Sequence, residues 1–102
     1  MDLDLKDRIC LVTGSTAGIG LETARLLAAE GARVVVNGRD ADRVDQARAD
    51  VGAALGVACD LSEPAAAEQL VAETAAALGA VECLVNNVGE AYQVGFEELT
   101  DE

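Results

Sequence analysis

Thr13-Gly14-Ser15-Thr16-Ala17-Gly18-Ile19-Gly20 sets three glycines between a short apolar run and a helical pattern. The apolar run is Ile9–Val12, and helical spacing follows over about residues 18–30, so the glycines lie at a strand-to-helix turn. Free amides and the helix dipole make such a turn a site for phosphate groups. The alternative is a glycine-rich turn that caps a helix and binds nothing.

Three further apolar runs follow, and each is too short for a helix: residues 33–37, residues 57–59 and Cys83–Val85. Their side chains are apolar at successive positions and do not alternate with polar ones. A strand needs this pattern when both of its faces are covered, as in a parallel sheet. The four runs therefore predict four parallel strands.

Helical spacing is predicted for the three segments that separate these runs. The first ends at Gly31 and has one apolar side: Ile19, Thr23, Leu26 and Leu27. The second runs from Asp40 to Gly52 and presents Val44, Ala47, Arg48 and Val51. The third has Ser62 as its expected N-cap and Pro64 in its first turn, ends at Gly79, and carries the stripe Leu70, Thr74 and Leu78.

The alternation of strands and helices predicts an α/β fold, a Rossmann-like doubly wound parallel sheet with strand order 3-2-1-4 and three helices. Residues 1–102 are expected to form a single dinucleotide-binding domain, with the ligand crevice beside the carboxyl end of the first strand. Thr100 and the two acidic residues after it are typical of a helix start. We therefore expect the domain to be truncated where a further helix begins, near residues 100–102.

The chain carries 19 acidic and seven basic side chains, for a formal charge of −12. This charge repels nucleic acid and anionic lipid, so neither is expected as a partner. A solvated surface explains the acidic surplus, and adaptation to high salt is the alternative. The start of the chain lacks the pattern of a signal peptide, and no apolar run approaches the roughly 20 residues that span a bilayer. A cytoplasmic location is predicted.

Cys10, Cys59 and Cys83 each lie in or at the end of an apolar run, and none forms a C-x-x-C pair. We interpret them as reduced, buried small hydrophobes, against the alternative of a metal or redox role. The chain contains no His, so a zinc site is not expected.

The glycine spacing TGxxxGIG, with Asp60-Leu61 after the third run and Asn86-Asn87-Val88-Gly89 after the fourth, resembles the short-chain dehydrogenase/reductase family. The resemblance covers residues 7–102, and Val88 stands where the family usually has Ala. It implies an oxidoreductase that uses NAD(P), and full-length relatives are commonly dimers or tetramers. The chain would then be the N-terminal, cofactor-binding part of such an enzyme.

The predicted cofactor-binding residues come from these motifs and from the end of the second run: Gly14, Ser15, Thr16, Gly18, Ile19, Gly20, Arg39, Asp60, Leu61, Asn86, Asn87 and Gly89. The glycines would admit the pyrophosphate, and the Ser15 and Thr16 hydroxyls would bond ribose or phosphate. Asp60 would accept from the adenine amino group, or would only close a turn before Ser62. The resemblance implies that one of the two Asn side chains ties the fourth strand to its neighbour and that the backbone of Asn86 and Asn87 lines the ribose site. Without the resemblance, an Asn-Asn turn is usually structural.

Cofactor choice depends on Gly38 and Arg39, because an enzyme that uses NAD usually has an acid there to hold the ribose diol. A guanidinium matches a 2′-phosphate, so NADP is predicted rather than NAD. Two observations oppose this choice: Ala17 stands where many NADP-using relatives have a second basic residue, and Arg39 has acidic neighbours to pair with on the surface, Asp40 and Asp42.

The family's catalytic Ser and Tyr-x-x-x-Lys are absent, since Lys6 is the one Lys and Tyr92 is followed by Gln-Val-Gly-Phe. The family places these residues beyond Glu102, so we expect truncation to explain their absence and the chain alone to be inactive. The leading hypothesis is the NADP(H)-binding part of a reductase that acts on a carbonyl or alcohol when complete. The alternatives are a noncatalytic nucleotide-binding or subunit-interaction module and, more weakly, another Rossmann-like enzyme such as a methyltransferase.

Overall fold

A computed structural model describes residues 4–87 of the chain. Three features named in the sequence analysis lie outside the described residues: Val88, the predicted site residue Gly89, and the helix expected near residues 100–102.

The described residues form one parallel sheet of four strands, in the order β3-β2-β1-β4. The strands are β1 (Ile9–Val12), β2 (Arg33–Gly38), β3 (Leu55–Ala58) and β4 (Cys83–Val85). The predicted class, strand number and strand order are confirmed. β3 begins two residues earlier than predicted and ends at Ala58, which leaves Cys59 in the following loop.

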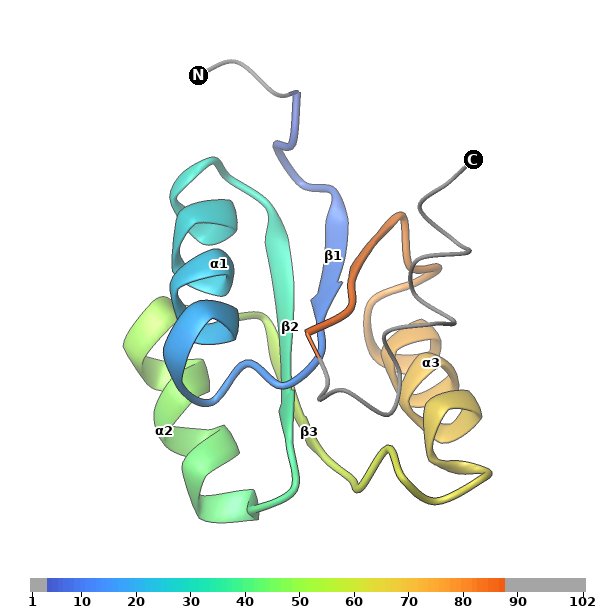
Figure 1. The fold of residues 1–102 in the computed structure, drawn as a ribbon. Helices are drawn as coiled ribbons and strands as arrows, with labels where there is room; N and C mark the ends of the chain where they lie inside the picture. Colours follow the sequence, from blue (N-terminus) through green and yellow to red (C-terminus); the bar gives the residue numbers. More distant parts are fainter. Residues whose placement is uncertain (1–3, 88–102) are drawn as a thin grey trace.

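Three helices connect the strands: α1 (Gly18–Ala29), α2 (Ala41–Val51) and α3 (Ala66–Ala77). α1 and α2 cover one face of the sheet, and α3 covers the other (Figure 1). Successive side chains of each strand point to opposite faces of the sheet and so enter two different cores. The core under α1 and α2 contains Val12, Val34 and Val36. The core on the other face contains Leu11, Val35, Val57 and Leu70 of α3. The sheet is therefore covered on both faces, as the continuous apolar runs require.

The face that α1 turns to the sheet agrees only in part with the predicted stripe, of which Leu27 packs against the core. Ile19 and Leu26 are 77% and 67% exposed, whereas the buried residues of α1 are Gly20 and Ala24. The reason is the short distance between helix and sheet: a Cβ at position 20 would meet the Gly14 carbonyl oxygen and the Asn87 side-chain nitrogen. Small residues occupy the positions nearest the sheet because they permit this approach, and Leu21 and Leu27 pack against the core beside them.

The predicted start of α3 was also wrong. The helix begins at Ala66, and Ser62 does not cap it. Instead, the Ser62 amide and hydroxyl both donate to the Asp60 carboxylate, at 2.9 and 2.7 Å. Ser62 is thus held in a turn at the end of β3, which places Pro64 before the helix and not in its first turn.

The second helix follows the prediction closely. Asp40 is its N-cap and accepts from the Asp42 and Arg43 amides, and Gly52 ends it with a left-handed φ of 71°. The buried residues of α2 are Val44, Ala47 and Val51, while the predicted Arg48 is exposed. No helix within residues 4–87 has the length and apolar character needed to cross a membrane.

Replacing Gly20 by Ala tests the close contact between α1 and the sheet. We expect Gly20→Ala to lower the free energy of unfolding by about 3 kcal/mol, because the added methyl meets backbone that cannot rotate away. Urea denaturation measures the change. Glu22→Ala, an exposed position of the same helix, is the control and should stay within about 0.5 kcal/mol of the parent chain. Equal stability of the two variants would contradict the close approach.

Candidate functional site

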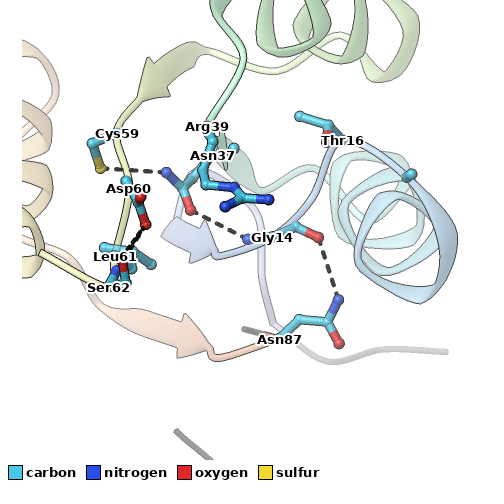
Figure 2. A pocket seen from close by; sticks show the side chains of 11 residues that line it. Gly14, Thr16, Asn37, Arg39, Cys59, Asp60, Leu61, Ser62 and Asn87 are labelled. Carbon is cyan, nitrogen blue, oxygen red and sulfur yellow. Dashed lines mark hydrogen bonds between the residues drawn. The ribbon is translucent and has the colours of Figure 1, made fainter. Parts of the chain in front are cut away.

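A cavity of about 390 Å³ opens at the carboxyl edge of the sheet, beside the end of β1. The loops after all four strands contribute to its wall: Gly14, Thr16 and Ala17 after β1, Asn37, Gly38 and Arg39 at the end of β2, Cys59, Asp60, Leu61 and Ser62 after β3, and Asn87 after β4. Figure 2 shows these side chains around one space. Parallel α/β sheets bind ligands at this edge.

The amide of Asn37 joins the glycine loop to two strands from inside the protein. Asn37 is 2% exposed, and its side-chain oxygen accepts the Gly14 N–H at 3.2 Å. Its side-chain nitrogen donates to the Val57 carbonyl at 3.2 Å and to the Cys59 sulfur at 3.5 Å. The first turn of the loop therefore depends on one buried amide of β2 (Figure 2).

Ser15 is buried in the same network and not directed toward the cavity. Its hydroxyl donates to the Val12 carbonyl at 2.7 Å and accepts the Asn37 N–H at 2.8 Å, while its own amide donates to the Asn37 carbonyl at 2.8 Å. The hydroxyl is therefore used inside the loop, and Thr16, which lines the cavity, is the hydroxyl available to a ligand.

The residues after β4 close the other side of the glycine loop. The Asn87 amide donates to the Thr13 hydroxyl at 2.7 Å, and the Asn87 side chain donates to the Gly14 carbonyl at 3.3 Å. The Thr13 hydroxyl lies 3.0 Å from Asn86 Oδ1, to which it donates. Both Asn side chains thus tie the end of β4 to the segment after β1, where the resemblance implies one such tie.

The amino end of α1 has the features that a bound anion requires. Its N-cap is Ala17, no side chain caps it, and its first turn contains no acidic residue. Gly18 has a φ of +60°, and the space where a Cβ would lie is open to 4 Å. Unshielded amides and an absent side chain admit a phosphate group at a helix N-terminus, so this end fits the pyrophosphate of a dinucleotide.

Two guanidinium groups lie near this end of the cavity. Arg39 and Arg43 line a neighbouring hollow of about 550 Å³ together with Thr16 and Asp40. Arg39 takes part in none of the ion pairs formed within residues 4–87. The alternative of a surface ion pair with Asp40 or Asp42 is therefore not formed there. Asp40 instead caps α2. The hollow therefore has a cationic wall suited to a phosphate group.

Asp60 closes the turn after β3, as the two Ser62 hydrogen bonds show. These bonds hold the pKa of the Asp60 carboxyl below its ordinary value, and the Arg39 charge lowers it slightly further. Asp60 is thus a carboxylate at neutral pH and faces the cavity beside Leu61.

The cavity brings together six of the predicted site residues: Gly14, Thr16, Arg39, Asp60, Leu61 and Asn87. Gly18 and Ile19 lie exposed at the start of α1, and Ser15 and Gly20 are buried behind it. Asn86 lines a separate apolar hollow against α3. Gly89 lies outside the described residues.

Sequence reasoning did not single out Asn37, Arg43 or Cys59. Asn37 could have been found as the polar residue that ends a predicted strand directly after three valines, and Arg43 as a basic residue four positions after Arg39. Nothing in the sequence indicated that Cys59 would face the cavity.

Residues 8–102 match the protein family described as short chain dehydrogenase. The chain belongs to this family. The matched range contains the glycine loop, Asp60, the Asn86-Asn87 turn and every residue that lines the cavity.

Several members of the short-chain dehydrogenase family are similar to this chain. The uncharacterized oxidoreductase YvrD of Bacillus subtilis is 40% identical over the whole chain, which corresponds to 40% of the relative. The NADP-dependent (R)-specific alcohol dehydrogenase of Lentilactobacillus kefiri is 39% identical over 96% of the chain and 40% of its own length. The crystal structure of L-sorbose reductase from Gluconobacter frateurii, complexed with NADPH and L-sorbose, superimposes with a TM-score of 0.80 at 33% identity, covering 88% of this chain and 36% of the other.

The chain thus spans about two fifths of the length of the curated relatives it matches. The part that it spans is the N-terminal, cofactor-binding part of a short-chain dehydrogenase, and the members of this family that resemble it include proteins described with NADPH or NADP.

Replacing Asn37 by Leu tests whether the buried amide holds the glycine loop. Asn37→Leu keeps the volume but leaves the Gly14 N–H and the Val57 carbonyl without their partner, so we expect a loss of about 2–4 kcal/mol in the free energy of unfolding. Urea denaturation gives the value. Gln46→Leu makes the same kind of change on the exposed side of α2 and should cost less than about 0.5 kcal/mol. A small effect at both positions would mean that the Asn37 bonds are dispensable.

Proposed function

We propose that this chain is the NADP(H)-binding part of a short-chain dehydrogenase/reductase which, in its complete form, transfers hydride between NADP(H) and a carbonyl or alcohol. The observation that supports it best is the single cavity in which the glycine loop, Arg39 and Asp60 meet. The cofactors in the descriptions of the L-sorbose reductase and the kefiri alcohol dehydrogenase favour NADP.

The glycine loop and α1 are proposed to hold the pyrophosphate. The amides of the first turn of α1, at Gly18, Ile19 and Gly20, carry the partial positive charge of the helix N-terminus. Thr16 would add a hydroxyl from the cavity wall. The close approach of α1 to β1 keeps these groups in place, because Gly20 packs directly on the Gly14 carbonyl.

Arg39 is proposed to bind the 2′-phosphate that distinguishes NADP from NAD. No acidic side chain is placed to hold a ribose diol at this point of β2, since the aligned residue is Gly38. A guanidinium binds phosphate through two parallel hydrogen bonds, which gives both energy and geometry. Arg43 lines the same hollow and would add a second positive charge, in place of the basic residue that Ala17 does not supply.

Asp60 and Leu61 are proposed to bind the adenine. The Asp60 carboxylate would accept from the exocyclic amino group, and the Leu61 amide would donate to the ring. Both residues line the far side of the cavity from Thr16, as the adenosine end of the cofactor requires (Figure 2). Asn86, Asn87 and Gly89 would place backbone beside the ribose next to the nicotinamide.

The bound nicotinamide would supply the hydride, and the protein orients it. The 102 residues contain no Tyr-x-x-x-Lys to move the proton of the substrate oxygen, so we propose that they bind the cofactor without catalysing the reaction. A cytoplasmic location and a homo-oligomeric complete enzyme remain predictions.

NADPH binding can be tested directly with the 102-residue chain. The chain contains no Trp, so the emission of NADPH itself is free of protein fluorescence from that source. We expect a saturable change in this emission on titration, in a sample whose circular dichroism shows it to be folded. A folded sample with no saturable signal would exclude cofactor binding by this chain.

The Arg39→Asp variant tests the choice of cofactor. We expect this variant to bind NADPH about 100-fold more weakly, or by ~2.7 kcal/mol, because a phosphate contact is lost and a repulsive charge is added. The affinity for NADH should fall by less than threefold, or it should increase. Titration of each variant with both cofactors gives the ratio.

Arg33→Asp is the matched control, since Arg33 is an exposed residue at the opposite end of β2 and its replacement changes the net charge by the same amount. It should leave the preference for NADPH unaltered. If the Arg39→Asp variant loses affinity for NADPH and for NADH by the same factor, Arg39 does not contact the 2′-phosphate.

A further inference from the structure

Cys10 and Cys83 are direct neighbours on the two strands that meet at the edge of the sheet. In the parallel pairing of β1 with β4, Cys10 stands opposite Cys83, followed by Leu11 opposite Leu84 and Val12 opposite Val85. Adjacent strands lie about 4.8 Å apart, which is inside the roughly 4.4–6.8 Å between the Cα atoms of a disulfide. The backbone spacing therefore permits a bond between the two sulfurs.

Both side chains also point to the same face of the sheet. Side chains two residues apart on a strand share a face, so Cys10 lies with Val12 and Cys83 with Val85. Val12 belongs to the core under α1 and α2, and Val85 packs against that same core. The two thiols thus meet on the α1 side.

The register beside the pair is held by side-chain contacts as well as by the strand ladder. The Glu82 carboxylate accepts the Ile9 N–H at 3.0 Å and pairs with Arg8 at 3.3 Å, and the Glu82 amide donates to the Ile9 carbonyl at 2.9 Å. These contacts keep β4 from sliding along β1, so the two cysteines stay opposite each other.

The two thiols differ in their exposure to solvent, and this difference indicates which of them reacts first with an oxidant. Cys10 is fully buried, whereas Cys83 is half-buried, contrary to the expectation that all three cysteines are buried. Cys83 also lines a hollow of about 250 Å³ at the amino edge of the sheet, with Asp4, Leu5, Arg8 and Glu82. Burial, the adjacent Cys83 thiol and the Glu82 charge together raise the pKa of the Cys10 thiol to about 11, against a smaller lowering by Arg8. Cys83 is therefore the thiol that a small oxidant reaches first.

We propose that Cys10 and Cys83 are a redox-active pair that hydrogen peroxide converts to a disulfide between β1 and β4. The Cys83 sulfur attacks one peroxide oxygen, which gives a sulfenic acid at Cys83 and one water. The Cys10 sulfur then displaces the hydroxyl from the Cys83 sulfur, which forms the S–S bond and a second water. The two sulfurs lose two electrons, peroxide gains two, and the two thiol protons leave in the two waters.

The bond would fasten the shortest strand of the sheet to its neighbour. β4 has three residues and pairs only with β1 among the described strands. Asn87, which closes the glycine loop, follows two residues after its end. A link at Cys83 would hold β4 in register from the opposite end, and it would form with or without a bound cofactor, so it does not depend on the proposed function.

The test treats the reduced 102-residue chain with a small excess of hydrogen peroxide, blocks the remaining thiols with N-ethylmaleimide, and determines the masses. We expect a loss of ~2 Da and a single blocked thiol per chain. Cleavage after Arg, Lys and Glu, which does not occur before Pro64, puts the three cysteines in separate peptides, 9–22, 49–68 and 83–90. The linked product should join the first and the third, and dithiothreitol should separate them.

Thermal unfolding provides the second measurement. The disulfide closes a long loop, so Tm should rise by about 5 °C or more on oxidation and return on reduction. The Cys59→Ser variant should behave like the parent chain, because it keeps both Cys10 and Cys83. Cys83→Ser, at a half-buried edge position, should fold but show no linked peptide and no rise in Tm.

Three blocked thiols, a linkage through Cys59, or covalent dimers in place of the internal bond would overturn the proposal. A linked peptide with an unchanged or lower Tm would overturn the claim that the bond fastens β4.

Discussion

The buried amide of Asn37 is the interaction on which the candidate site depends. It accepts from Gly14 and donates to Val57, so one side chain connects the ends of β1, β2 and β3 at the edge where the cavity opens. A buried amide that lost these partners would leave polar groups without hydrogen bonds, which is costly in a region that water does not reach. The glycine loop is thus held in one conformation before any ligand binds.

The close approach of α1 to the sheet follows from the same arrangement. Gly20 packs on the Gly14 carbonyl and beside the Asn87 side chain, and both of these groups belong to the network around the loop. Ile19 and Leu26 lie on the outer side of α1, while Leu21 and Leu27 pack against the core at the flanks of the contact. Loop, helix and fourth strand are therefore one packing unit, whose open side is the uncapped amino end of α1.

Ionic groups are distributed unevenly around this unit. The chain is strongly acidic, yet the hollow beside Thr16 has two arginines in its wall and the first turn of α1 has no acidic residue. Long-range repulsion from a net charge of −12 is screened within about 10 Å at ordinary salt, whereas a guanidinium in contact acts directly. The local arrangement explains how an acidic protein of this family can accommodate the phosphates of a dinucleotide.

The order of elements, the parallel sheet and the place of the glycine loop could be predicted from the sequence, because strand length, continuous apolar runs and glycine spacing are local properties of the chain. The sequence also indicated Arg39 and Asp60, since each lies within two residues of the end of a strand. The folded structure was needed to show which side of α1 is buried, that Ser62 bonds Asp60 and does not cap α3, and that Ser15 faces inward while Thr16 faces the cavity. It alone placed Asn37 under Gly14 and Cys10 opposite Cys83. These features depend on distances between segments far apart in the chain, and such distances are set by packing that no local pattern encodes.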